Sequence, residues 1–202
     1  MPLHALLTLE DGTLACAERV PFRSAPGQGT LCLVRAADGF SDPARFLRAE
    51  EREAPPHASE AVDFVSFATR AEAARALSNA AAALEARQTI CDELSAMGRE
   101  ALLLRLRYSL RRERLVVQLS PQSFTDAKSL RDVISSKLRC QVDVRIVMQR
   151  SLAAAIGGLG VCGRRICCSL GISPPRDPSG SAPRPRDTSP GLCNRPCCCI
   201  SF

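Results

Sequence analysis

Two groups of cysteines near the end of the chain have the residue types and spacing to bind a metal. Cys162 is followed five residues later by the vicinal pair Cys167–Cys168. Cys193 is followed at the same distance by a second pair, Cys198–Cys199. Each group has glycine before its first cysteine and arginine two positions after it. Thiolates on glycine-rich loops are common ligands of iron–sulfur clusters and zinc. The repeat predicts six metal ligands: Cys162, Cys167, Cys168, Cys193, Cys198 and Cys199.

The spacing favours an iron–sulfur cluster, with zinc and unligated or redox-active thiols as alternatives. Zinc sites usually separate the cysteines of a pair by two to four residues, whereas these pairs are adjacent. Each group offers three thiolates and a 4Fe–4S cluster needs four, so the fourth must come from the other group or from a partner. Cys197 is supernumerary. The terminal letters CISF match a prenylation signal in form, but the repeat already accounts for Cys199.

Cysteine use and the ends of the chain predict a cytoplasmic protein. The first residues, MPLHALLTLEDGT, lack the basic start of a signal peptide, and no apolar run is long enough to span a membrane. Thiols stay reduced in the cytosol, so eleven cysteines indicate metal or redox chemistry rather than a disulfide framework. We therefore expect no membrane insertion.

The segments before the cysteine groups predict an α+β fold. Short apolar runs separated by turn signals favour a small β sheet or barrel over residues 1–50. The charged, proline-containing segment 51–65 is expected to connect it to an α+β domain over 66–156. The irregular, cysteine-rich metal-binding tail follows over 157–202, and its segment 171–190, with six prolines in twenty residues, is expected to be a linker.

A long helix is expected at the start of the α+β domain. Segment 68–86 has ten alanines in nineteen residues, so we predict a helix from about 66 to 97. It is expected to pack on the domain, and a coiled helix against a partner is the alternative. A strand–strand–helix–strand unit should follow, with strands near 102–110, 115–119 and 141–148 and a helix between the last two.

Arginines gather on the predicted hairpin of this unit. The period-two pattern of 102–110 places Leu102, Leu104 and Leu106 on one face and arginines on the other. With a net charge of +6, this cluster is either a solvated sheet face or a surface that contacts phosphates or acidic partners. RNA contact is expected to be weak at most. The cluster comprises Arg105, Arg107, Arg111, Arg112 and Arg114.

The sequence shows no set of residues typical of an enzyme site. There is no phosphate-binding loop and no defensible Ser/His/Asp or paired-carboxylate spacing. The two histidines, His4 and His57, lie far from both cysteine groups in sequence. We therefore expect a non-catalytic protein.

The cysteine segments resemble a known family. GGLGVCGRRICCS at 157–169 closely matches the first hallmark of the bacterial PSP-one C-terminal-domain family of RicT-like subunits. GLCNRPCCC at 191–199 is similar to the second hallmark, with Asn194 in place of a glycine and Cys197 at a usually apolar position. Upstream, QVDVRIVMQR at 141–150 is more weakly similar. The chain departs from the family at SLAAAI (151–156) and in the proline-rich segment.

The resemblance implies a scaffold rather than a stand-alone enzyme. RicT-like subunits join small helical protein partners in a complex that carries 4Fe–4S clusters, modulates mRNA processing by ribonuclease Y and affects phosphorelay signalling. The expected function is therefore regulatory and cytoplasmic, with the six cysteines as cluster ligands. The alternative is a zinc-binding, nucleic-acid-binding module that uses the arginine-rich hairpin.

Overall fold

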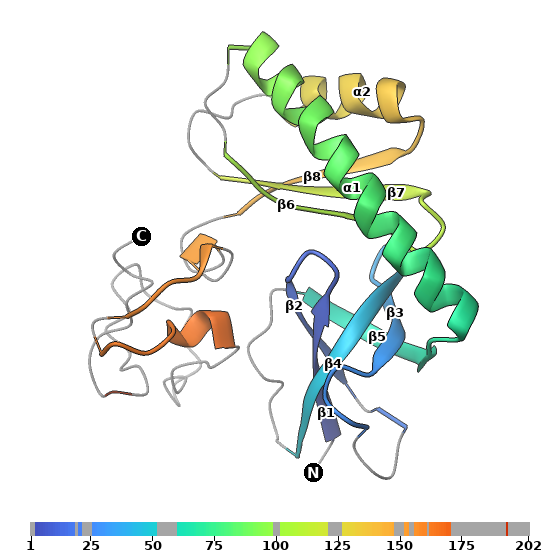
Figure 1. The fold of residues 1–202 in the computed structure, drawn as a ribbon, viewed down its shortest axis with the longest axis vertical. Helices are drawn as coiled ribbons and strands as arrows, with labels where there is room; N and C mark the ends of the chain where they lie inside the picture. Colours follow the sequence, from blue (N-terminus) through green and yellow to red (C-terminus); the bar gives the residue numbers. More distant parts are fainter. Residues whose placement is uncertain are drawn as a thin grey trace. The chain divides into compact units, whose positions relative to one another are not determined.

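The structure, a computed structural model, describes residues 3–18, 20–21, 26–51, 60–98, 102–120, 127–147, 152–153, 156–160, 162–170 and 193. The chain divides into two compact units, 1–147 and 148–202. The first unit joins a β barrel to a sheet covered by two helices (Figure 1), so the predicted α+β class is confirmed. None of the described helices is long and apolar enough to cross a membrane.

Five strands close the barrel in the order β1-β2-β5-β3-β4. Their bounds are Leu3–Leu9 (β1), Leu14–Glu18 (β2), Leu31–Ala36 (β3), Ser41–Glu51 (β4) and Glu60–Phe67 (β5). Neighbouring strands are antiparallel except β2 and β5, which are parallel. The barrel confirms the β structure expected for residues 1–50.

Small side chains fill the interior of this barrel. Alternate residues of each strand point inward, because side chains on a strand alternate between its two faces. The buried set comprises Ala5, Leu7, Leu9, Ala15, Ala17, Val20, Cys32, Val34, Ala44, Phe46 and Val62. A narrow barrel leaves little internal space, which explains the many alanines.

The prediction that 51–65 is a connector is wrong over its last part. Residues 52–59 lie outside the described residues, but 60–67 form strand β5, which pairs with both β2 and β3. Val62 and Phe64 turn toward the barrel core while most of β5 remains exposed. The sequence did not predict this strand, because apolar residues alternate only weakly along it and an acidic, proline-containing stretch precedes it. The boundary between the two units also falls at 147, before the predicted 156.

The second half of the first unit is a three-stranded sheet under two helices. Helix α1 (Arg70–Ala96) is followed by β6 (Leu103–Tyr108), β7 (Arg114–Leu119), α2 (Ala127–Leu138) and β8 (Gln141–Ile146). Strand β7 is central, antiparallel to β6 and parallel to β8. This order confirms the predicted helix and strand–strand–helix–strand unit. The helix begins later than predicted, because residues 66 and 67 still belong to β5.

Helices α1 and α2 cover one face of the sheet (Figure 1). Ile90 of α1, Leu130 and Ile134 of α2, and Leu115 and Val117 of β7 are all fully buried in this core. Helix α1 starts with a capping box, in which Thr69 Oγ accepts a hydrogen bond from Glu72 N and the Glu72 carboxylate accepts one from Thr69 N. The box satisfies backbone N–H groups that the first helical turn leaves without partners.

A β-bulge changes the predicted alternation of the first hairpin strand. The register between β6 and β7 shifts between Leu103 and Arg105. An extra residue on one strand reverses the face to which the preceding side chains point. Leu103 is therefore in the core and Leu102 is 54% exposed, opposite to the prediction. Beyond the bulge, Leu106 and Tyr108 face the core as expected.

Candidate functional site

The first cysteine group lies on a tight loop of the second unit. Leu159 and Arg165 form an isolated antiparallel bridge, and Gly160 N donates a 2.8 Å hydrogen bond to Arg164 O. Cys162 stands at the tip, between these partners. Gly158 and Gly163 have φ values of 118° and 73°, a region that residues with a Cβ rarely adopt. The glycines of the motif therefore allow the chain to turn back on both sides of Cys162.

The vicinal pair leaves this loop in a short helical turn, η1 (Cys167–Leu170). Cys168 is buried beside Ile166, whereas Cys167 is half-buried and Cys162 is exposed. Ser169 ties the turn to the loop, because its N–H and its hydroxyl both donate hydrogen bonds to Ile166 O. The two adjacent thiols thus have different surroundings, as expected if they are not to bind one ion together.

The first cysteines of the two groups interact. The thiol of Cys193 lies close enough to Cys162 to favour its thiolate, although 31 residues separate the two cysteines in the chain. The pKa of Cys162 lies below its ordinary value, chiefly because the backbone N–H of Arg164 donates to its sulfur and also because of Cys193 and the Arg164 charge. Hydrogen-bond donors and positive charge favour the thiolate, the form that binds metals.

The thiols of these cysteines are suitable ligands for a soft metal. The described residues, however, include only four of the six predicted ligands. Every described cysteine is a thiol rather than half of a disulfide. Within the described ranges, no three Cys, His, Asp or Glu side chains come close enough together to hold a metal ion. The structure thus joins Cys162 with Cys193 but does not gather Cys167 and Cys168 with them. Cys197, Cys198, Cys199 and the predicted linker 171–190 lie outside the described residues.

The four cysteines of the first unit have structural positions. Cys16 and Cys32 are buried in the barrel, and burial raises the pKa of each thiol to about 11. Cys91 and Cys140 are half-buried and pack against the core beneath the helices. A buried thiol with a raised pKa behaves as a small apolar side chain.

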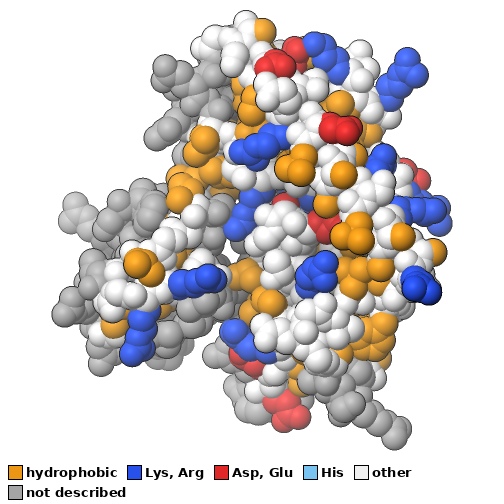
Figure 2. Space-filling view, in the orientation of Figure 1, with side chains coloured by type: hydrophobic (Ala, Val, Ile, Leu, Met, Phe, Trp, Pro, Cys, Tyr) orange, Lys and Arg blue, Asp and Glu red, His pale blue; other side chains and the backbone are white. Residues whose placement is uncertain are grey.

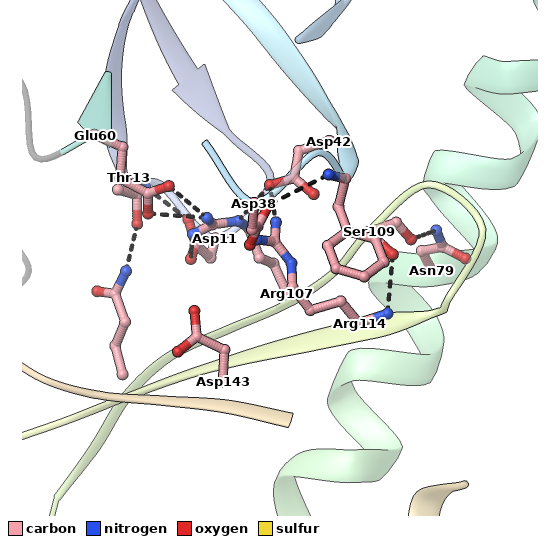
Figure 3. A network of polar contacts seen from close by, with 12 residues as sticks. Asp11, Thr13, Asp38, Asp42, Glu60, Asn79, Arg107, Ser109, Arg114 and Asp143 are labelled. Carbon is pink, nitrogen blue, oxygen red and sulfur yellow. Dashed lines mark hydrogen bonds and ion pairs between the residues drawn. The ribbon is translucent and has the colours of Figure 1, made fainter. Parts of the chain in front are cut away.

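The predicted outward-facing arginine cluster is wrong for Arg107, which is 1% exposed. Its guanidinium faces three carboxylates of the barrel (Figure 3). Nη1 donates to Asp11 Oδ2 at 2.8 Å, Nη2 to both oxygens of Glu60 at 2.8 Å, and Nε to Asp42 Oδ2 at 3.3 Å. Burial disfavours a charged guanidinium, but these carboxylates raise the pKa of Arg107 above its ordinary value.

Arg114 is buried in the same way. Its guanidinium donates to Asp42 Oδ2 at 2.6 Å and is paired with Asp38. The ring of Phe40 lies 5.1 Å from the guanidinium carbon, within the range of a cation–π contact. Burial raises the pKa of Asp42 to about 6 despite the adjacent arginines. Among the described residues, no group hydrogen-bonds to Asp42 Oδ1 or Arg114 Nε.

The other three arginines differ from each other. Arg105 is half-buried and lines a hollow of about 310 Å³ together with Glu10 and Asp11, and burial lowers its pKa. Arg112 donates to Asn79 Oδ1 at 2.7 Å and to Ser78 on α1, while Arg111 is exposed. The five arginines therefore do not form one solvated surface. Of the carboxylates that pair with Arg107, only Asp42 lies within a strand, whereas Asp11 is in the β1–β2 turn and Glu60 is the first residue of β5, so no local sequence pattern marked them as its partners.

The comparisons with known proteins add no relative. The chain matches no family model, no curated protein and no solved structure. A functional assignment therefore depends on the chain's own residues, of which the Cys162–Cys193 contact and the buried Arg107 network are the most specific features.

Proposed function

We propose that this protein is a non-catalytic scaffold that holds an iron–sulfur cluster in its second unit. The contact between Cys162 and Cys193 carries the proposal. The first cysteines of two groups that equal spacing identified as a repeat interact with each other. A loop whose backbone N–H groups and arginine favour thiolates surrounds one of them, as expected for a site that holds an anionic cluster.

The candidate ligands are the two first cysteines and the two vicinal pairs. Cys162 and Cys193 would supply one thiolate from each group, and Cys167, Cys168, Cys198 and Cys199 provide the further thiolates. A bound 4Fe–4S cluster would supply one-electron chemistry or rigidity to this unit. The chain's own residues hold the thiolate of Cys162 by hydrogen bonds, shield Cys168 from water and turn the loop at its glycines.

The cellular role that we propose is regulation of mRNA processing through protein partners. The match of 157–169 and 191–199 to the hallmark segments of RicT-like subunits supports it, and the partners implied are small helical proteins and ribonuclease Y. The hairpin alternative is disfavoured, because Arg107 and Arg114 are committed to ion pairs within the chain. We accordingly place the functional surface outside the arginine hairpin.

Anaerobic purification with metal analysis tests the cluster. We expect iron and acid-labile sulfide in about equal amounts and a brown protein whose colour is lost on oxidation. Cys162→Ser and Cys193→Ser should each lose most of the iron, while Cys91→Ser and Cys140→Ser, thiols of the first unit, should retain it. Stoichiometric zinc without iron would show that these cysteines bind zinc rather than an iron–sulfur cluster.

The partner role is measured separately. The full chain, with its native cysteines, is tested for co-purification with ribonuclease Y and with small helical proteins under the same anaerobic conditions. Loss of iron in Cys162→Ser with retained co-purification would separate the metal from partner binding. A folded wild-type protein that is free of both iron and zinc would refute the metal site.

A further inference from the structure

Helix α1 has two apolar faces. One face is buried on the sheet and includes Ala76, Ala86, Ile90 and Leu94. A second face carries four further apolar residues that are exposed: Ala74, Leu77, Ala81 and Leu84, the last at the edge of the hollow that Arg105 lines. Leu77 is 68% exposed and Leu84 is 73% exposed, the highest values among the described large apolar residues of the first unit. We call these four residues the outer stripe.

The outer stripe has the spacing of a coiled-coil seam. Its four members follow each other at intervals of three, four and three residues, and Arg70 continues the line four residues before Ala74. This spacing keeps side chains on one line along a helix, so that a second helix can contact all of them. Leucine and alanine alternate along the line. Figure 2 shows apolar side chains recurring along the course of α1 on this face of the molecule.

We propose that the outer stripe pairs with the outer stripe of a second copy of this chain, with the two α1 helices antiparallel. In this register Leu77 lies beside Ala81 of the second copy, and Ala74 lies beside Leu84 of the second copy. Each layer then combines one large and one small side chain, so the two helices approach closely without clashing. The two-fold axis passes near position 79, and the contact is closed because the same surface is used on both copies.

The charges at the ends of the stripe favour the antiparallel orientation. Arg70 begins α1 on the line of the stripe, and Glu85 flanks the line near its other end. Antiparallel pairing brings Arg70 of each copy toward Glu85 and Gln88 of the other. Parallel pairing would instead set Arg70 against Arg70, which is unfavourable for like charges. This complementarity is the observation that selects a second copy as the partner.

The contact is expected to be reversible. The stripe with Arg70 and Gln88 spans about 27 Å of helix at about 1.5 Å per residue, one helix wide. Such a contact is smaller than the roughly 800 Å² per partner that is typical of stable complexes. Self-association should therefore vary with protein concentration in the micromolar range.

Sedimentation velocity of the full chain, under reducing and anaerobic conditions, tests the pairing. We expect a monomer–dimer equilibrium in wild type and at least a tenfold weaker association in Leu77→Glu and Leu84→Glu. Leu102→Glu is the matched control, because Leu102 is an exposed leucine outside the stripe. Circular dichroism establishes that the variants remain folded. A wild-type chain that is monomeric throughout, or association that survives both stripe substitutions, would overturn the proposal.

Charge exchange tests the orientation. Arg70→Glu places like charges beside each other in the antiparallel pair and should weaken association several-fold. Adding Glu85→Arg to the same chain should restore it, because the pair is then reversed rather than broken. Failure of the double variant to recover association would overturn the antiparallel register. Neither residue is near the cysteine groups in sequence, so the iron content provides an independent readout that should not change.

Discussion

Replacement of Arg107 by leucine should destabilise the first unit strongly at neutral pH. Arg107 lies on β6 and pairs with three carboxylates of the barrel: Asp11, Asp42 and Glu60. Leucine keeps much of the side chain's bulk but leaves these buried carboxylates without their cation. Removing one partner of a buried ion pair typically costs about 3–5 kcal/mol, because the remaining charges lose their compensation. We expect Arg107→Leu to fall in this range at pH 8.

The pH dependence of the loss distinguishes charge from packing. Without the guanidinium, the pKa values of the three carboxylates should rise in the folded state, so they take up protons as the pH falls. Protonation removes the uncompensated charge. The deficit of Arg107→Leu relative to wild type should therefore be smaller at pH 4.5 than at pH 8, by about 1 kcal/mol or more. A loss caused only by packing would be the same at both pH values.

Urea unfolding at the two pH values, followed by circular dichroism, measures the effect. Arg111→Leu serves as the matched control, because Arg111 is an exposed arginine of the adjacent turn and should change stability by no more than about 0.5 kcal/mol. A cost of Arg107→Leu below about 1 kcal/mol at pH 8, or a deficit that does not change with pH, would contradict the stabilising role of this buried charge.

Two further changes test Asp42 and the start of α1. Burial raises the pKa of Asp42 to about 6 from 3.8, so the folded state holds this proton more tightly than the unfolded chain does. The stabilisation of the folded state by protonated Asp42 is fully present below about pH 4 and is lost as the pH rises through about 6. At about 1.4 kcal/mol per unit of pKa shift, this loss amounts to about 3 kcal/mol in the free energy of unfolding. In urea titrations at several pH values, the stability of Asp42→Asn relative to wild type should therefore rise by about this amount between pH 4 and pH 7, and a constant difference would contradict the assigned pKa. Thr69→Ala removes the capping box of α1 and should cost about 1 kcal/mol in thermal unfolding, while Ser66→Ala on β5 should cost little. Equal effects of these two substitutions would count against the cap.

Local sequence patterns predicted the helices and the order of the strands that follow them. The alanines of 68–86 favour a helix in any context, and Leu130 and Ile134 recur at helical spacing, so α1 was expected near its observed bounds and α2 between the last two strands. The period-two runs predicted β6, β7 and β8 for the same reason. Strand β5 was missed, because its stability comes from pairing with β2 and β3, which are distant in sequence.

Repetition in the sequence also identified the candidate ligands. Equal spacing in the two cysteine groups, with arginine at the same offset, predicted Cys162 and Cys193 as corresponding metal ligands and left open whether one cluster takes ligands from both groups. The structure added that these two thiols interact and that Cys168 is buried while Cys162 is exposed. Burial depends on which residues surround the loop, and spacing along the chain does not contain that information.

The arginines show most clearly what only the tertiary structure decided. A charged residue alternating with leucines on a strand is ordinarily on the solvent face, and the sequence accordingly indicated an exposed basic cluster. The barrel covers that face and brings Asp11, Asp42 and Glu60 to Arg107. These carboxylates are separated from Arg107 by 96, 65 and 47 residues. The sequence by itself determined the spacing of apolar residues that predicts helices and strands, and the repeated cysteine groups, because these patterns depend only on residues that are close in the chain. Which charges were buried was decided by contacts between distant segments, which form only when the barrel and the sheet come together.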